Sequence, residues 1–354
     1  MENIFDYIED NGNYLFEEKE FNSIDALILS TISYVEFDGI IENKRNYISL
    51  SDALEKFISN CDYKGFVSRG FVNKEVFKLA RYLINKKRYK DIKCYYYVHN
   101  VTNDSQFSAI TMKLTDGTTF ISFEGTDHNL VGWEEDFALS YTFPVPAHKD
   151  AIKYLNKVVS ILDKKVIVAG HSKGGHLAIV SSMYANIFVK HKIKAIYNFD
   201  GPGLREEQID TKKYRNIENK ILHIVPNYSI FGLLLNHGEN YYVVKSKSKD
   251  IYAHSVFTWF IQDSDFVYTE LSEFSKKLEY SIKLWLEEHD DIEREKMVKE
   301  IFKLLKSLEI NNFFEIFKMK NIFTLIKNSR TMDEGTKEML KNFVVFNIDY
   351  MFDN

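Results

Sequence analysis

The chain has 354 residues, of which 45% are hydrophobic, so it is long enough for one large domain or two smaller ones. Its 46 basic and 51 acidic side chains leave a net charge of −5, which gives no reason to expect nucleic-acid binding. The only cysteines are Cys61 and Cys94, which excludes a disulfide framework and indicates a reduced, intracellular protein.

The N-terminal residues do not have the pattern of a secretory signal. Residues 1–10 are acidic, so no positively charged region precedes the apolar stretch at 26–35. No apolar run approaches the ~20 residues that span a bilayer. We therefore expect a cytoplasmic protein without a transmembrane segment.

Apolar spacing predicts helices in the first 90 residues and strands directly after them. Three helices are predicted: Ser23 to about Val35, Ser51 to Ile58, and Glu75 to Asn85. Three strands follow, at 95–99, 107–114 and 118–123, the last two joined by a hairpin turn at Thr115-Asp-Gly117.

The middle of the chain alternates helices with strands. Apolar residues recur on one face of 151–162, which predicts a core-facing helix. Four further strands are expected, at 166–169, 193–199, 221–225 and 241–245. Strands that alternate with helices form a mostly parallel sheet covered on both faces, so the fold class is α/β.

Glycine and proline are concentrated in the middle of the chain. All four prolines lie between Pro144 and Pro226, and ten of the fifteen glycines lie between Gly117 and Gly238. The last third is nearly free of helix breakers, so we expect four helices there. They should run from Asp265 onward and break near Asp290, Glu309 and Arg330. The predicted organisation is a helical N-terminal extension at 1–90, an α/β core at 91–264, and a helical C-terminal extension at 265–354 packed on the core.

The most informative motif is Gly170-His-Ser-Lys-Gly174, which follows the apolar strand at 166–169 and precedes an amphipathic segment at 176–189. Strand, tight turn with a central serine, and helix is the order of a nucleophile elbow. Gly170 and Gly174 flank Ser172 where a Cβ would collide with the neighbouring strand or helix. Ser172 is therefore the candidate nucleophile.

A serine nucleophile needs a histidine base, and in hydrolases with this elbow the histidine comes last in the chain. His254 satisfies this order, because it follows the last predicted strand after the polar loop at 246–250. We predict His254 as the base, with His237 as the alternative.

The acid that orients the base is less well defined. Asp200 follows the strand at 193–199 in a Gly/Pro turn, where a carboxylate can reach a histidine. A local role in holding that turn is the competing interpretation. The usual alternative position follows the next strand, but only Asn227 and Ser229 occur there. We predict Asp200 as the acid, with the degenerate position near Ser229 as the alternative.

An oxyanion hole needs N–H donors that converge on the nucleophile. The amide of Lys173 follows the nucleophile, and Thr126, at the end of the strand at 118–123, can offer its amide and its hydroxyl. We interpret Trp133 as a core residue and Asp136 as a brace for a loop.

With these residues assembled, the chain resembles the lipase-like α/β-hydrolases. It is similar to the class 3 lipases, and more closely to a bacterial family of uncharacterised α/β-hydrolases related to them. The class 3 pattern has an F-R-G-T/S strand end, a W-x-x-D element and G-H-S-x-G-G. The matching stretches here are Phe123-Glu-Gly-Thr126, Trp133-Glu-Glu-Asp136 and Gly170-His-Ser-Lys-Gly-Gly175, within about residues 92–262.

The resemblance implies an α/β-hydrolase fold with Ser172 as nucleophile, Thr126 in the oxyanion hole and His254 as base. The sequence departs from the class 3 pattern at Glu124, which replaces an arginine. It departs again at Ser229, where the class 3 acid position falls.

These features predict an intracellular serine hydrolase of the esterase, lipase or thioesterase type, acting on a small-molecule or lipid-like acyl ester. No cofactor is expected. No His/Cys/Asp set has metal-ligand spacing, and neither a P-loop nor a dinucleotide motif occurs. An acyltransferase would use the same residues. A binding or scaffold protein on a degenerate hydrolase fold is the alternative, favoured by the missing carboxylate after Val225. Apolar stripes beside lysines at 313–326 leave peripheral membrane contact open, and no oligomeric state is indicated.

Overall fold

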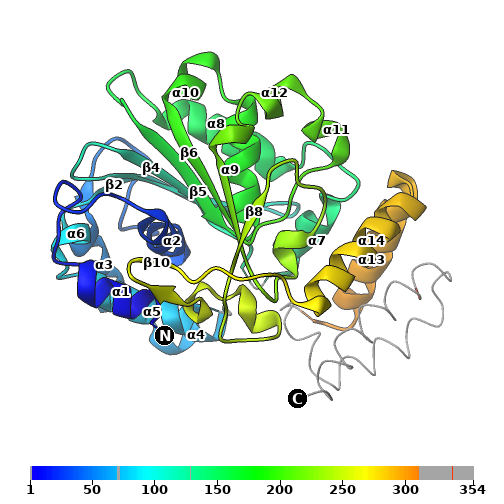
Figure 1. Ribbon diagram of the computed structural model, residues 1–354, viewed down its shortest axis with the longest axis horizontal. Helices are drawn as coiled ribbons and strands as arrows, with labels where there is room; N and C mark the ends of the chain where they lie inside the picture. The colour runs from blue at the N-terminus through cyan, green and yellow to red at the C-terminus, as the bar shows by residue number, and fades with distance from the viewer. Residues whose placement is uncertain (1, 70–71, 128, 311–336, 338–354) are drawn as a thin grey trace.

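The computed structural model describes residues 2–69, 72–127, 129–310 and 337. An eight-stranded sheet runs through its centre, and the strands lie in space in the order in which they occur in the chain (Figure 1). The strands are β1 (Ile48–Ser49), β2 (Lys93–Val101), β3 (Gln106–Lys113), β4 (Thr119–Phe123), β5 (Val166–His171), β6 (Ile193–Phe199), β7 (Ile221–Pro226) and β8 (Tyr241–Val244).

The sheet is mostly parallel. Strands β1 to β4 pair in antiparallel fashion, and β4 to β8 pair in parallel. All seven predicted strands lie within or overlap strands of this sheet, so the α/β class is confirmed. Because β5 to β8 are parallel, their carboxyl ends meet at one edge of the sheet. Ligand and catalytic groups of α/β proteins gather at that edge.

N-terminal helices cover one face of the sheet (Figure 1). Their core includes residues of these helices together with Ile167 and Ala169 of β5. Inside this layer Arg88 and Asp25 form a fully buried ion pair, with 2.6 Å between Nη2 and Oδ2. The helices are α1 (Ile4–Asn11), α2 (Ser23–Thr31), α3 (Leu50–Asn60), α4 (Tyr63–Arg69), α5 (Asn73–Leu83) and α6 (Lys87–Lys90).

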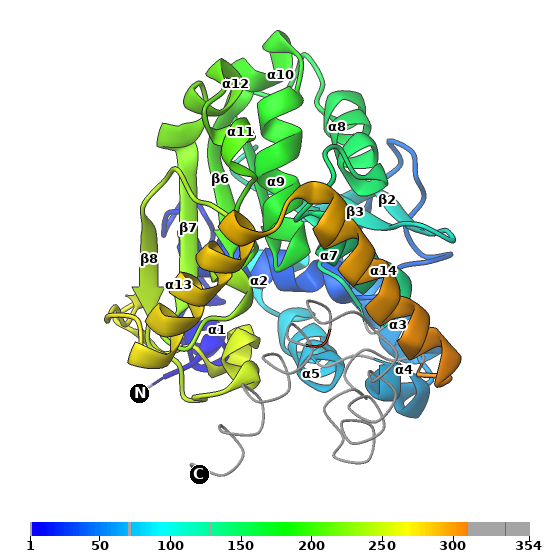
Figure 2. The same cartoon turned by 90° about the vertical axis from the view of Figure 1, so that its right-hand side faces the viewer.

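Helices from the second half of the chain cover the opposite face. Alternate residues of β5, Val166 and Val168, join α8 (Pro146–Val158) and α9 (Lys173–Tyr184) in a second core. Two successive residues of one strand thus point into different cores, as the pleat of a strand requires. Beyond these helices lie α10 (Ile187–Lys192), α11 (Glu206–Ile209) and α12 (Lys212–Arg215) (Figure 2).

Two predicted helix starts are wrong by one or two residues. Asn22, and not Ser23, caps α2, because its side chain accepts from two amides of the first turn while Asp25 bonds back to the cap. Ser49, and not Ser51, caps α3. The first of these helices also ends early, at Thr31, and continues as the 3-10 turn η1 (Ile32–Tyr34).

The first C-terminal helix begins later in the chain than predicted. Asp265 lies in a two-stranded ribbon, β9 (Ile261–Gln262) with β10 (Asp265–Phe266), and the first helix is α13 (Glu273–Glu288). The expected break at Asp290 is confirmed, since Asp290 caps α14 (Asp291–Ser307). The break at Glu309 is confirmed as well, while Arg330 lies outside the described residues.

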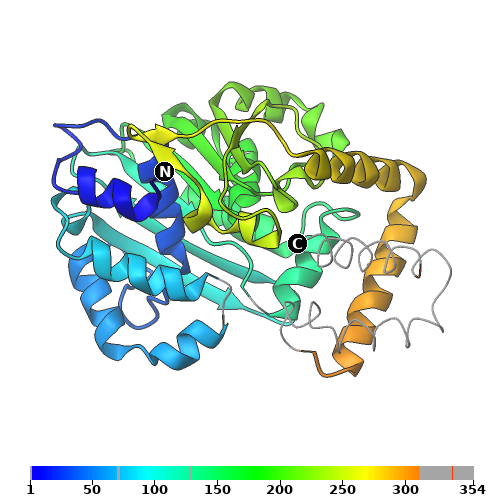
Figure 3. The same ribbon diagram turned by 60° about the horizontal axis from the view of Figure 1, so that its bottom comes forward.

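Helices α13 and α14 form an arm at one side of the molecule (Figure 3), and α14 lies beside α7 (Leu130–Ala138). Val298, Phe302 and Leu305 of α14 share a buried apolar cluster with Leu130 and Trp133 of α7. None of the described helices combines the length and the apolar character that crossing a membrane would need.

Candidate active site

Ser172 occupies the turn between β5 and α9 in a strained conformation. Its φ of 57° and ψ of −134° lie in a region that residues with a side chain rarely adopt. The turn leaves no room for side chains at its flanking glycines. A Cβ on Gly170 would lie 2.2 Å from the carbonyl carbon of Gly174, and one on Gly174 would lie 2.1 Å from the oxygen of Phe123. The predicted reason for these glycines is therefore confirmed.

The nucleophile candidate is almost fully buried, and its hydroxyl is uncommitted. Ser172 is 8% exposed, and its amide donates to the Phe199 carbonyl at 2.9 Å, which fixes the turn against β6. Among the residues that the structure describes, no hydrogen bond involves Ser172 Oγ. A hydroxyl held this way can engage a base or a substrate, and catalytic hydrogen bonds often tighten only when substrate is present.

His254 and Asp200 form a close pair at the same edge of the sheet. Asp200 follows β6 with a φ of 52°, and His254 ends the 3-10 turn η4 (Ile251–His254). The distance from His254 Nδ1 to Asp200 Oδ2 is 2.6 Å. The other carboxylate oxygen, Oδ1, accepts from Ser229 Oγ at 2.5 Å and from the Gly232 amide at 3.1 Å. The structure thus joins two of the predicted site residues, His254 and Asp200. Ser229, at the alternative acid position, donates a hydrogen bond to Asp200.

Burial acts on both members of this pair. It raises the pKa of the Asp200 carboxyl and lowers the pKa of the His254 imidazole. The three donors around Asp200 act against burial and favour its ionised form. The carboxylate then holds the proton of the neutral imidazole on Nδ1, and Nε2 is left as the nitrogen that can accept a proton.

His171 supports the backbone of His254. Its Nε2 lies 2.9 Å from the His254 carbonyl oxygen, which can only accept, so Nε2 carries the hydrogen. Its Nδ1 must then accept, and the Tyr34 hydroxyl donates to it at 2.8 Å. Burial lowers the pKa of His171 to about 3, so the ring stays neutral. On the other side, the ring of Phe231 lies 4.4 Å from that of His254, centroid to centroid.

The predicted oxyanion donors lie on two different elements. Lys173 begins α9, where its amide has no acceptor within the helix. The Thr126 hydroxyl donates to Asp136 Oδ2 at 2.5 Å, so this hydroxyl is committed and only the amide of Thr126 can serve as predicted. Gly125 brings that segment against the elbow, because a Cβ there would lie 3.0 Å from Ser172 Cβ and 2.1 Å from the Tyr34 hydroxyl.

The side chain of Lys173 anchors the start of α9. It is 2% exposed and forms ion pairs with Glu135 and with Asp136, the latter at 3.3 Å. Burial acts to lower the pKa of Lys173, but the two carboxylates outweigh it and the pKa is raised. Asp136 therefore connects Thr126 to Lys173, which agrees with the predicted bracing role. Trp133 packs in the core on Phe231, as predicted, with ring centroids 5.6 Å apart.

Comparison with known proteins adds a family. A model of the Mbeg1-like family matches residues 83–303, which is more than half of the chain. The chain belongs to the Mbeg1-like family. This is a lipase-like family, and the α/β fold agrees with it. A search of solved structures finds the crystal structure of M37 lipase, at 15% identity and a TM-score of 0.34, over 60% of this chain and 68% of that one. A search of curated proteins finds no match.

The contacts of several site residues could not be predicted from motifs in this Mbeg1-like sequence. Tyr34 lies in the first 90 residues, before the family match, and reaches the site only because its helical layer packs on the sheet. Phe231 lies in the apolar stretch at 231–235, and no motif there signals its contact with the ring of His254. His171 was visible inside the elbow motif itself, but nothing in the sequence signals its contact with the backbone of residue 254.

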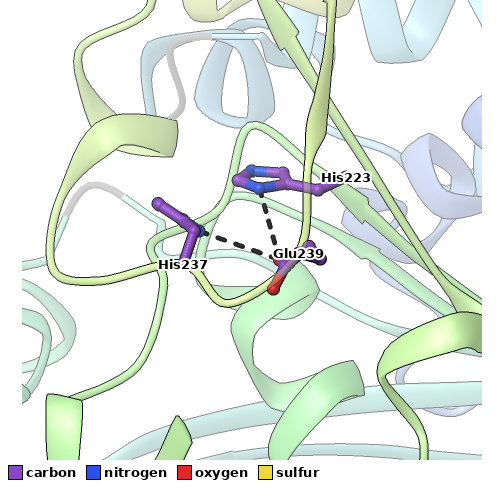
Figure 4. A group of neighbouring side chains, drawn as sticks. All are labelled: His223, His237 and Glu239. Atoms are coloured by element: carbon purple, nitrogen blue, oxygen red, sulfur yellow. Dashed lines mark ion pairs between the residues drawn. The ribbon is translucent and has the colours of Figure 1, made fainter.

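The alternative base, His237, lies in a different cluster. Its ring packs on that of His223, 4.5 Å away between centroids, and both face Glu239 (Figure 4). The sequence shows no such cluster because its members come from β7 and from the loop before β8.

Proposed function

We propose that this Mbeg1-like protein is a serine hydrolase that cleaves an ester or thioester through an acyl-enzyme. The observation that carries the proposal is the strained Ser172 at the carboxyl end of β5, at the sheet edge that also holds the His254–Asp200 pair. A strained serine between strand and helix, together with a histidine held by a buried carboxylate, is the arrangement that activates a hydroxyl.

The chemistry would run in two halves. As Ser172 Oγ attacks the acyl carbon, His254 Nε2 takes the hydroxyl proton, and Asp200 stabilises the imidazolium through Nδ1. The amides of Thr126 and Lys173 hold the oxyanion. His254 then gives its proton to the leaving alcohol or thiol, and the acyl group stays on Ser172. In the second half His254 takes a proton from water as the water oxygen attacks the acyl carbon. His254 then returns this proton to Ser172 Oγ as the bond to the acyl carbon breaks and the acid leaves.

The surroundings of the base support an acyl substrate with an apolar chain. The ring of Phe231 lies against His254, and Trp133 packs on Phe231. An apolar wall beside the reacting atoms favours an alkyl or aryl acyl group over a charged one. An acyltransferase differs only in using another acceptor in place of water.

The competing proposal is a non-catalytic scaffold, and it depends on the missing carboxylate after Val225. The hydrogen bond from Ser229 to Asp200 supports hydrolysis instead, because the residue at that position assists the acid on the preceding strand.

Covalent labelling with a fluorophosphonate probe tests this proposal on the full chain. We expect the native protein to be labelled and Ser172→Ala and His254→Ala to lose labelling, each with an unchanged thermal midpoint. Ser181→Ala is a matched control, because that serine is buried on α9 and donates to a backbone carbonyl. Native protein that is folded but not labelled would refute the proposal, as would labelling that survives Ser172→Ala.

A further inference from the structure

A second group of titratable side chains has no part in the proposed hydrolysis. His223 lies on β7, and His237 and Glu239 flank Gly238 in the loop that leads into β8 (Figure 4). The Nδ1 atoms of His223 and His237 lie 3.4 and 3.8 Å from Glu239 Oε1. One possible ligand atom from each of the three residues lies within 4.8 Å of the others.

These atoms are buried and lack hydrogen-bond partners. The three side chains are 0%, 6% and 6% exposed, in chain order. Within the described residues, neither nitrogen of either histidine, nor Glu239 Oε1, has a hydrogen-bond partner. Buried polar atoms are nearly always paired, because an unpaired one costs about 1–3 kcal/mol. Here the two Nδ1 atoms and Oε1 face only one another, without a hydrogen bond, and the two Nε2 atoms have no hydrogen-bond partner among the described residues. This arrangement indicates a ligand that the protein alone does not supply.

The chemistry of the three side chains suits a cation. An imidazole offers a lone pair on one ring nitrogen, and a carboxylate offers its oxygens. A buried carboxylate between imidazoles attracts positive charge.

A further residue orients the carboxylate. The Tyr214 hydroxyl donates to Glu239 Oε2, which leaves Oε1 for the cluster. The tyrosine ring also lies over the turn, since a Cβ on Gly238 would come within 2.6 Å of it. Hydrogen bonds of this kind to the far oxygen are typical of metal-binding carboxylates.

We propose that His223, His237 and Glu239 form a binding site for a divalent transition metal, and that Zn²⁺ is the best match. Two imidazole nitrogens and one carboxylate oxygen are zinc ligands, and they leave a fourth position for water. Ligands of a tetrahedral zinc ion lie about 3.3 Å apart. The two nitrogen–oxygen distances, 3.4 and 3.8 Å, are close to this spacing.

The site would hold the loop between β7 and β8 at both ends. His223 lies before the loop, and His237 and Glu239 lie at its far end. Between them come Ser229 and Gly232, which donate to Asp200. A metal here would therefore fix the segment that positions the candidate acid.

Zinc titration of the full chain, after chelation and dialysis, tests this site. We expect calorimetry to give one Zn²⁺ per chain, and the thermal midpoint to rise by roughly 5 °C with zinc near 100-fold above its dissociation constant. Co²⁺ should give the visible absorption of a four-coordinate site. Glu239→Gln keeps the shape of the side chain and should weaken binding by more than about 100-fold. His191→Gln, on the exposed end of α10, is the matched control and should bind as the native chain does.

Zinc uptake that is absent from the native chain, or equal in Glu239→Gln, would overturn the site. Loss of uptake in His191→Gln would do the same. If Glu239→Gln fails to fold, His237→Gln replaces it in the titration and should weaken zinc binding in the same way. The Co²⁺ spectrum of the native chain then tests the coordination. Fluorophosphonate labelling of the same preparations keeps this result separate from the proposed hydrolysis, because labelled protein without zinc uptake refutes the metal site alone.

Discussion

The hydroxyl of Ser229 gives a direct test of whether Asp200 is the catalytic acid. In the structure this hydroxyl donates to Asp200 Oδ1 at 2.5 Å, while His254 Nδ1 faces Oδ2. Ser229→Ala removes one of three donors and leaves the histidine contact intact. If the carboxylate must be ionised to hold His254, the loss should appear as a change in pH dependence.

The size of the change follows from the hydrogen bond. A bond to a charged group contributes about 1.5–3 kcal/mol, and one pKa unit corresponds to 1.36 kcal/mol. Burial already raises the pKa of Asp200, and the loss of Ser229 raises it by about 1–2 units more. More of the carboxyl is then protonated near neutral pH, so labelling of Ser172 should slow by about 10-fold there and recover at higher pH.

The assay is the second-order rate constant for fluorophosphonate labelling, measured from pH 5.5 to 10. We expect the acid limb of Ser229→Ala to lie about 1–2 pH units above that of the native chain, with equal rates on the alkaline plateau. Ser181→Ala should follow the native curve. Parallel curves for native chain and Ser229→Ala, at any offset in rate, would refute the role of Asp200 argued here.

Three further substitutions have expected outcomes. Gly125→Ala places a Cβ 2.1 Å from the Tyr34 hydroxyl and should slow labelling by at least about 10-fold, with partial recovery in a Tyr34→Phe background. Lys173→Met leaves buried carboxylates without their cation and should lower the free energy of unfolding by about 3–5 kcal/mol, measured in urea. Glu124→Gln should change how stability depends on pH. Burial raises the pKa of the folded Glu124 carboxyl from 4.5 to about 8, so the native chain should lose stability as pH rises through this window. The variant should lose about 3 kcal/mol less between pH 5 and pH 8.

Each of these predictions has an outcome that would contradict it, and Lys173→Met has a matched control. Lys306→Met removes an exposed ion pair with Glu134 and should cost less than about 1 kcal/mol. An equal loss in Lys173→Met and Lys306→Met would contradict the argument from burial. Full labelling of Gly125→Ala would show that the backbone after β4 can shift to fit the added Cβ without disturbing the turn at Ser172. A stability curve for Glu124→Gln that parallels the native one would show that the carboxyl titrates normally.

The strands and the elbow could be predicted because their signals are local. Residues 166–174 contain the apolar strand, the glycines that the turn requires and the serine in one continuous stretch. The helix starts at Ser23 and Ser51 were misplaced because Asn22 and Ser49, just before them, are equally good caps. Only backbone geometry distinguishes such neighbours.

The rest of the site depends on which segments the sheet brings together. Nothing near Tyr34 in the sequence indicates that its hydroxyl reaches His171, which lies 137 residues away. In the same way, His223 lies within a predicted strand, and nothing in the sequence indicates that it contacts Glu239. Contacts of this kind come from strand order and helix packing, which composition and periodicity do not determine.

The order of the sheet has a consequence for synthesis on the ribosome. Because neighbours in the chain are neighbours in the sheet, each strand can pair with the previous one as it emerges. At about 5–20 residues per second, the roughly 80 residues between Ser172 and His254 take about 4–16 s to appear. If the proposed function holds, an unfinished chain has its candidate nucleophile in place before its candidate base, and reactivity is withheld until residue 254 has emerged.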